Sequence, residues 1–559
     1  MNAEARALRL TSAITWLTAA VFFAAVLLVA IVIPIHAQDA LTFGEWSRLI
    51  SGHWHLHYPS ATGQEYGRPL FYVLQGWMWG LFGFSEISGR VLSGLFSGLL
   101  LVALVWLVRD REWGRVAGAL AALALIATPV YATHVVAGLT DIPVAALVAL
   151  AGALVWSRRP GPARAVAACA VATLAMLAKP SALLALVGLV LGQVLLRESW
   201  RSRLVYRMAP VAGGIGIGLI YDLVQANYVH QGLRTFLQAG VNTDYYRSLA
   251  TDARRYALLD GNWFGDGLRV ATFFALFYAV GRLAGASHRK GVFAGVPLAL
   301  FASWLGPWIA AHEARVSVGS LHSVGAAFAA LGTTAFLVVG ALSYQDAVAS
   351  RVELARFGLW ALPTATAWAL YGAYDFRLLA PAWPPLLALV VLSALPAAAA
   401  LVRRGPAAVA LPLALFAIVV AENVYNVDGL QKSGWDQLRR TPTADWLDSG
   451  VTRAIVMPAF ARTLLIVQPE MKKDDLLISP EGAFRFFFPG HVEQSFPLRC
   501  DDVHRFRVFV LATDEGSRRY MEDFLHVSGD PAFWAKCSAP HLKQLNDGFE
   551  GYAVFRVGP

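Results

Sequence analysis

The most informative shortage in this sequence is one of charge. Only 15% of its 559 residues are charged, whereas 57% are hydrophobic, and soluble domains carry about 25% charged residues. This composition excludes a soluble globular protein. The apolar residues also gather in blocks of about the 20 residues that an α-helix needs to cross a bilayer. The sequence therefore predicts a polytopic α-helical membrane protein.

Two other features are absent from the sequence, and their absence limits the classes of function that it can have. The net charge is +9, but no basic stripe with interleaved aromatic residues accompanies it, so the charge does not indicate nucleic-acid binding. The sequence also shows no internal repeat, low-complexity tract or Gly/Ser linker.

The first apolar block, 10–35, is far longer than the core of a signal peptide, so we interpret it as an uncleaved first span.

The apolar blocks predict about thirteen spans. They cover residues 10–35, 91–108, 116–132, 142–156, 165–178, 181–196, 209–223, 270–284, 292–311, 324–343, 357–371, 383–402 and 406–421.

The distribution of arginine and lysine predicts the orientation of these spans. One set of alternate loops is rich in basic residues, and the short loops between them, 132–140 and 179–180, have almost none. The basic set comprises Arg109, Arg111, Arg115, Arg158, Arg159, Arg164, Arg197, Arg201, Arg203, Arg207, Arg282, Arg289, Lys290, Arg351, Arg356, Arg403 and Arg404. By the positive-inside rule, this set and the N-terminus lie in the cytoplasm. Thirteen spans then place the C-terminus outside. We expect the protein to reside in the inner (cell) membrane.

The extracytoplasmic side has three long segments in this topology. Residues 1–421 form the transmembrane domain, with extracytoplasmic loops 36–90 and 224–269. The second loop mixes aromatic and basic residues, which is typical of interfacial helices. The tail, 422–559, changes to short apolar stretches, such as 454–457, 476–478 and 506–511, with a helical pattern at 517–525. We expect it to fold as an extracytoplasmic α/β domain.

The three cysteines fit this topology. Cys169 lies within a predicted span and is interpreted as a packing residue. Cys500 and Cys537 both lie in the tail, and an even pair in an oxidising compartment favours a disulfide; the alternative is two unrelated thiols.

Ionisable residues gather at the extracytoplasmic ends of the predicted spans. They are Asp39, Glu65, Arg68, Asp141, Lys179, His312, Glu313 and Arg377. Any one of them alone is equally well explained as a solvated helix end or a snorkelling side chain. Together, carboxylates and cations on one face suit a site that binds an anionic group and abstracts a proton.

Several motifs resemble those of the C-type (GT-C) glycosyltransferases. The segments 67–74 (GRPLFYVL) and 81–90 (LFGFSEISGR) are similar to the branch that holds protein O-mannosyltransferases and the aminoarabinose transferases that modify lipid A. The segments 139–143 (LTDIP), 178–180 (AKP) and 377–381 (RLLAP) with Pro384 resemble later motifs of that branch, in the same order. The match departs where Ala40 follows Asp39, since the family has Asp-Glu there, and where Arg68 replaces a lysine. The paired-Trp signature of the oligosaccharyltransferases is absent.

The resemblance implies transfer of a sugar from a polyprenyl-phosphate donor to an extracytoplasmic acceptor, with inversion. An inverting displacement needs a base, for which Asp39 fits best, with Asp141 as a second carboxylate that orients or replaces it. Arg68, Lys179 and Arg377 would stabilise the leaving phosphate, and Glu65 and His312 complete the substrate-binding candidates. Some relatives bind a divalent metal ion, and Glu65 and His230 occupy the matching positions.

Two other functions remain open. A polytopic lipid or polysaccharide transporter, or flippase, would also be rich in arginine, but it should show paired halves with broken helices at matching places, which this sequence lacks. A non-catalytic anchor for the tail would leave the charges on the loops unexplained. No motif specifies the sugar or the acceptor, which could be a glycolipid, a polysaccharide or a protein of the cell envelope.

Overall fold

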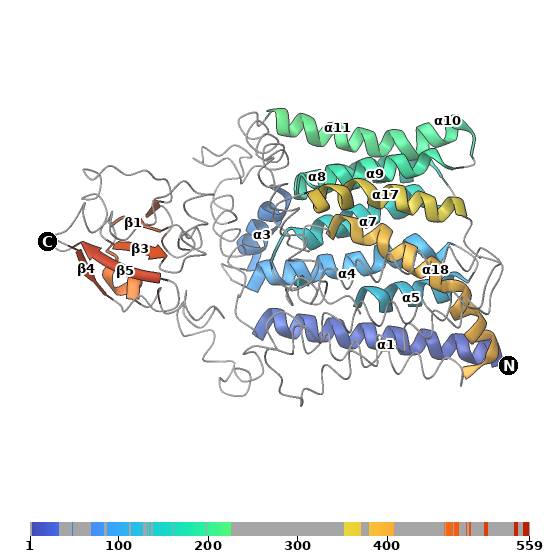
Figure 1. The fold of residues 1–559 in the computed structure, drawn as a ribbon, viewed down its shortest axis with the longest axis horizontal. Helices are drawn as coiled ribbons and strands as arrows, with labels where there is room; N and C mark the ends of the chain where they lie inside the picture. The colour runs from blue at the N-terminus through green and yellow to red at the C-terminus, as the bar shows by residue number, and fades with distance from the viewer. Residues whose placement is uncertain are drawn as a thin grey trace, which may run out of the picture. The chain divides into compact units, whose positions relative to one another are not determined.

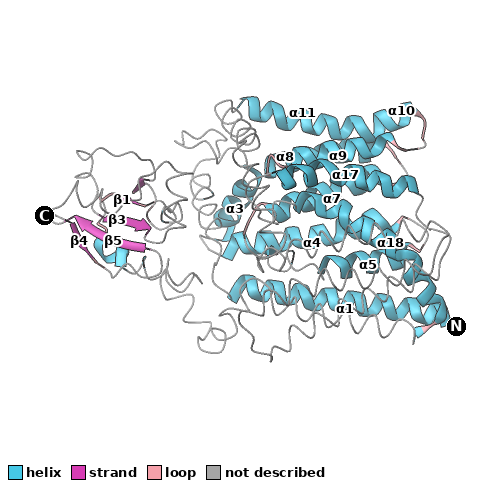
Figure 2. Cartoon of the chain, in the orientation of Figure 1, coloured by secondary structure: helices cyan, strands magenta, loops and turns pink. Residues whose placement is uncertain are grey.

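A computed structural model of the chain describes two groups of residues (Figures 1 and 2). The first covers 3–32, 47, 69–82, 87–110, 113–126, 131, 134–135, 138–158, 160–196, 198–224, 351–370 and 380–406. The second covers 463, 466–472, 475–479, 484, 488, 491–493, 508–512, 542–545 and 552–557. The chain divides into two compact units, Met1–Ala30 with His55–Leu74 and Arg90–Asp428, and Ile31–Trp54 with Gln75–Gly89 and Gly429–Pro559. The predicted boundary between residues 421 and 422 remains a prediction.

The first group consists of helices. They are α1 (Ala3–Val32), α3 (Pro69–Phe82), α4 (Ile87–Arg109), α5 (Gly114–Ile126), α7 (Asp141–Trp156), α8 (Pro162–Ala178), α9 (Ala182–Val194), α10 (Trp200–Arg203), α11 (Ala209–Val224), α17 (Arg351–Leu370) and α18 (Trp383–Arg404), with a π-helical turn, Leu204–Met208, between α10 and α11. Among them, Ala5–Leu28, Ser88–Arg109 and Trp200–Tyr221 are long and apolar enough to cross a membrane, and α5, α7, α8 and α9 are shorter apolar helices.

Most predicted spans within these residues coincide with a helix. The blocks 91–108, 142–156, 165–178, 209–223 and 383–402 match α4, α7, α8, α11 and α18 closely. The third block, 116–132, contains most of α5, which ends at Ile126, and residues 127–130 and 132 of this block lie outside the described residues. The spans predicted at 270–284, 292–311 and 324–343 lie outside the described residues, as does nearly all of 406–421.

Two helical segments lie where the sequence analysis placed loops. Helix α3, Pro69–Phe82, occupies part of the first predicted loop; its apolar run is only 14 residues long, which is too short for the span criterion. The helix before residue 209 begins at Trp200, because α10, the π-helical turn and α11 run on without a break. Arg203 and Arg207 therefore lie within a helix and not in a connecting loop.

Helix α7 is the most deeply buried helix described. Every residue from Asp141 to Trp156 except Leu150 is buried, and α7 packs on α8, α9 and α18. Helix α9 packs closely along α17, and α8 along α11 (Figure 1). A helix hydrophobic on all sides belongs inside a bundle, and α7 takes that place.

Glycines allow the close approach of α9 to α17. A Cβ atom on Gly188 would lie 2.1 Å from the Trp360 carbonyl oxygen, and one on Gly192 would lie 2.7 Å from the Arg356 carbonyl oxygen. Small residues of this kind let helix backbones pack closely in membranes. The Trp156 ring, at the end of α7, also packs on α17. It stacks on Phe357 at a centroid distance of 4.5 Å and on Trp360 at 5.0 Å.

The second group contains a five-stranded mixed sheet with the order β2-β1-β3-β5-β4. Its strands are β1 (Leu477–Ile478), β2 (Val492–Glu493), β3 (Val508–Ala512), β4 (Leu542–Gln544) and β5 (Tyr552–Val557). Strand β1 pairs in parallel with β2 and β3, and β5 pairs antiparallel with β3 and β4. Two apolar stretches of the predicted tail, 476–478 and 506–511, supply β1 and most of β3. The stretch at 454–457 and the helix predicted at 517–525 lie outside the described residues.

Candidate active site

The start of α7 carries the first described residue of the predicted site. Asp141 opens the helix with an acidic side chain in the first turn, where a negative charge complements the positive end of the helix dipole. Pro143 lies in the same turn and is tolerated there, because the first backbone N–H groups of a helix have no partner within it.

The second described residue of the predicted site, Lys179, follows the end of α8. Lys179 has extended backbone angles, φ −167° and ψ 134°, because a residue before proline is forced out of the helical region. Pro180 therefore ends α8 at this point. Its short turn leads directly into α9, with the Ala182 N–H donating to the Lys179 carbonyl over 3.0 Å.

This turn brings Lys179 to Asp141. The Lys179 ammonium donates to Asp141 Oδ1 in a buried ion pair, and the two residues are only 8% and 4% exposed. Removing one partner of such a pair leaves an uncompensated buried charge and costs about 3–5 kcal/mol. The structure thus brings together two of the predicted site residues, from segments 38 positions apart.

Thr140 is a polar neighbour that the sequence analysis passed over. It precedes Asp141 and is fully buried, yet among the described residues its hydroxyl neither caps α7 nor finds another hydrogen-bond partner. A buried hydroxyl without a partner costs about 1–3 kcal/mol. The start of α7 therefore combines a carboxylate, an ammonium and an unused hydroxyl. The signal in the sequence that could have identified Thr140 is its position inside the 139–143 motif.

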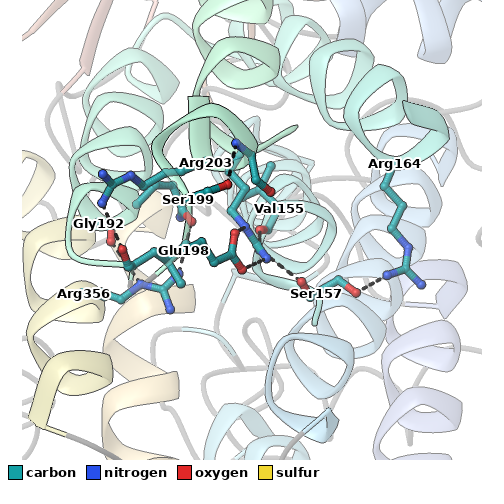
Figure 3. Close-up of polar contacts among 12 residues, drawn as sticks. Val155, Ser157, Arg164, Gly192, Glu198, Ser199, Arg203 and Arg356 are labelled. Atoms are coloured by element: carbon teal, nitrogen blue, oxygen red, sulfur yellow. Dashed lines mark hydrogen bonds and ion pairs between the residues drawn. The ribbon is translucent and has the colours of Figure 1, made fainter. Parts of the chain in front are cut away.

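The opposite end of α7 is occupied by arginines (Figure 3). The Arg207 guanidinium donates to the Val155 carbonyl, to the Ser157 carbonyl over 3.0 Å, and to the Glu198 carboxylate. Arg356 donates to the Gly192 carbonyl over 3.1 Å and stacks over the Trp156 ring. Both arginines are buried, and both complete the carbonyl groups that a helix leaves unpaired at its C-terminal end. The sequence analysis counted them only as loop charges.

The other predicted residues lie outside the described part of the chain. These are Asp39, Glu65, Arg68, His230, His312, Glu313, Arg377, Cys500 and Cys537. Their predicted roles, the divalent metal site and the disulfide therefore remain predictions. Within the described ranges, no group of three or more His, Cys, Asp and Glu side chains suits a metal ion.

Comparisons with known proteins agree with the motifs. Residues 67–224, which include the Asp141–Lys179 pair, match the sequence model of the family "Dolichyl-phosphate-mannose-protein mannosyltransferase". The fold is similar to the crystal structure of ArnT from Cupriavidus metallidurans bound to undecaprenyl phosphate, with a TM-score of 0.50 and 14% identity over 97% of this chain and 98% of that one. The family match supports a GT-C glycosyltransferase, and the structural match supports the fold of one.

The structure of the same ArnT in the apo state also matches, with 16% identity and a TM-score of 0.44 over 97% of this chain and 99% of that one. A comparison with curated protein sequences gives no match. The family match and the apolar helices together support a membrane-embedded glycosyltransferase.

Proposed function

We propose that this membrane glycosyltransferase moves a sugar from a polyprenyl-phosphate donor to an extracytoplasmic acceptor, with inversion at the anomeric carbon. The observation that carries the proposal is the buried Asp141–Lys179 pair at one end of α7, within the residues that match the family. The undecaprenyl phosphate bound in the ArnT structure, which has a similar fold, supports a polyprenyl phosphate as the lipid carrier of the donor sugar.

The reaction assigns a role to each predicted group. The acceptor hydroxyl attacks the anomeric carbon, its proton passes to the Asp39 carboxylate, and the bond from the anomeric carbon to the phosphate oxygen breaks. Polyprenyl phosphate leaves with an added negative charge. Arg68, Lys179 and Arg377 stabilise that charge, and the arginine forks suit phosphate oxygens. Glu65 and His312 contribute to substrate binding.

The ion pair refines the parts played by Asp141 and Lys179. The Asp141 carboxylate holds an ammonium, so we assign it the orientation of Lys179 and leave the base role to Asp39. Lys179, fixed by Pro180 behind it and Asp141 in front, is thus a pre-oriented charge for the phosphate.

We further propose the predicted topology for this reaction: about thirteen spans in the inner membrane, a cytoplasmic N-terminus, and an extracytoplasmic α/β domain over 422–559. The arginine-capped ends of α7 and α9 support it, because they put the buried basic residues at the end of α7 opposite to Asp141. The catalytic face then lies outside, where a lipid donor and an envelope acceptor meet.

The deciding experiment is transfer by Asp39→Asn. Purified protein is given a panel of polyprenyl-phosphate sugars, and released polyprenyl phosphate is measured together with the anomeric configuration of the product. Asp39→Asn keeps shape but removes the proton acceptor, so we expect turnover to fall by about 10²–10⁴ with donor binding retained. Asp110→Asn, at a partly exposed carboxylate that follows α4, is the matched control.

Other outcomes are equally informative. Near-normal turnover by Asp39→Asn would move the base role to Asp141. Sugar crossing the membrane without release of polyprenyl phosphate, for every donor, would overturn the transferase in favour of a transporter.

A further inference from the structure

The outward side of α9 carries an unbroken apolar stripe. Its members are exposed by 38–46%: Val187, Leu191, Val194 and Leu195. Their spacing of four, seven and eight residues places them on one helix face. The neighbouring face, with Gly188 and Gly192, is buried against α17. The stripe is therefore a surface along α9 and its C-cap residue Leu195 that the rest of the described bundle leaves partly exposed.

A tryptophan and an arginine are fixed at the end of this stripe. Trp200 begins α10 and is 57% exposed, with the Arg203 guanidinium 4.9 Å above its ring. Arg203 is held in turn, because its Nη1 donates to the Val194 carbonyl over 2.5 Å and to the Leu196 carbonyl over 2.9 Å (Figure 3). Trp200 is thus an ordered aromatic side chain where the apolar surface ends, as at the interface between acyl chains and headgroups.

The charge beside Trp200 is positive. Arg201 is its exposed neighbour in sequence. The carboxylate of Glu198, three residues before Arg201, is engaged by the buried Arg207. Arg201 is therefore an exposed cation that follows Trp200 in the short helix whose Arg203 bonds to Val194, at the end of the apolar stripe. Its planar guanidinium can donate two parallel hydrogen bonds to the oxygens of a phosphate diester.

We propose that this corner binds one anionic phospholipid. The α9–α10 corner, as we name it, consists of Val187, Leu191, Val194, Leu195, Trp200 and Arg201. An acyl chain lies along the stripe, Trp200 lies at the level of the glycerol, and Arg201 pairs with the headgroup phosphate. The stripe selects a phospholipid over free phosphate, and the positive charge of the exposed Arg201 selects an anionic headgroup over a zwitterionic one. This site lies at the end of the bundle opposite to the Asp141–Lys179 pair and goes beyond the proposed transfer reaction.

The test uses the purified full-length protein and native mass spectrometry. Retained lipid is counted after incubation with phosphatidylglycerol or with phosphatidylcholine of the same acyl chains. We expect the protein to prefer phosphatidylglycerol. Arg201→Gln should lower its retention about fivefold, the effect expected for one basic side chain at an anionic surface. Trp200→Ala should lower the retention of both lipids, because it removes the aromatic contact and not the charge.

Arg158→Gln is the matched control, since Arg158 is an exposed arginine following α7 at the same end of the bundle. It should leave retention unchanged. Equal retention of the two lipids by the unmodified protein overturns the proposal. So does an equal loss in Arg158→Gln and Arg201→Gln, which would show only diffuse attraction by the basic surface. Each variant is first checked for monodispersity by size exclusion, and both exposed arginines can be changed without opening the core.

Discussion

Lys179, the residue that follows α8, forms a buried ion pair with Asp141, the residue that begins α7. The pair depends on local sequence at both ends. Pro180 forces Lys179 out of the helical conformation, and Asp141 is stabilised at the positive end of the α7 dipole. Two residues at the ends of antiparallel neighbouring helices are thereby locked together inside the bundle.

The first prediction concerns the energy of this pair. Asp141→Asn and Lys179→Gln each leave one buried charge without its partner, so each should destabilise the protein by about 3–5 kcal/mol. The double variant Asp141→Asn/Lys179→Gln carries neither charge and should lose less than the sum of the two, with a coupling of about 0.5–3 kcal/mol. The measurement is the fraction of monodisperse protein remaining after heating in detergent. Strict additivity would contradict the pair.

The same cycle separates stability from chemistry. If Lys179 stabilises the leaving phosphate, the double variant should regain much of its thermal stability while its transferase activity stays low. Recovery of both together would make the pair purely structural and remove Lys179 from the site.

The sequence predicted this site as a set of residues on one face but not as a pair. The motifs at 139–143 and 178–180 identified Asp141 and Lys179 as candidates. Their contact depends on how α7 packs against α8 and on the turn that reverses the chain, and neither follows from periodicity. Thr140 was missed for a related reason, since a threonine before a helix is normally its cap, and only the structure shows that this hydroxyl makes no cap.

The second prediction concerns the contact between α9 and α17. In Gly188→Ala the new methyl group would lie 2.1 Å from the Trp360 carbonyl oxygen, so the two helices must separate and the protein should lose stability. Gly216→Ala in α11 is the matched control, because nothing lies within 4 Å of its new Cβ atom. A helical glycine with open space at its Cβ position should gain about 0.5–1 kcal/mol when replaced by alanine. Equal thermal stability of the two variants would contradict the close packing.

The third prediction concerns Arg356. Its guanidinium stacks 4.3 Å above the Trp156 ring and donates to Gly192 and Gln193 over 3.1 Å. Arg356→Lys keeps the charge but loses the planar fork, and should cost about 1–3 kcal/mol of stability. The KM for the lipid donor should not change, because Arg356 lies at the end of the bundle away from Asp141. Arg158→Lys at the exposed loop is the control and should be neutral in both assays.

The arginine cluster also shows what sequence patterning left out. The positive-inside rule placed these arginines at the cytoplasmic ends of helices, as a topological signal. The structure gives Arg203, Arg207 and Arg356 a second role, since each completes carbonyl groups at the end of α7 or α9. Charge counts cannot reveal this role, because it depends on the three-dimensional neighbour of each side chain. Helix α3 was missed because a 14-residue apolar run falls below the length that a span requires.

The fourth prediction concerns Cys500 and Cys537. Protein isolated without reduction from an oxidising compartment should yield a peptide that links the two, detected by mass spectrometry after alkylation and digestion. Cys169 is a free thiol inside α8 and serves as the internal control, labelled with or without reductant once the protein is unfolded. Free thiols at both tail positions would contradict the disulfide without affecting the transferase.

The last prediction concerns orientation. If the arginine-capped ends of α7 and α9 face the cytoplasm, a reporter fused after Arg404, at the end of α18, should report a cytoplasmic location. One fused after Asn426 should report the outside, since the predicted span 406–421 lies between them. The physical reason is that lysine and arginine are retained on the cytoplasmic side during insertion. A cytoplasmic signal from both fusions would remove the last span and place the β-sheet of 477–557 on the cytoplasmic side. An outside signal after Arg404 with a cytoplasmic one after Asn426 would invert the bundle, placing the Asp141–Lys179 pair in the cytoplasm and ending its role in extracytoplasmic transfer.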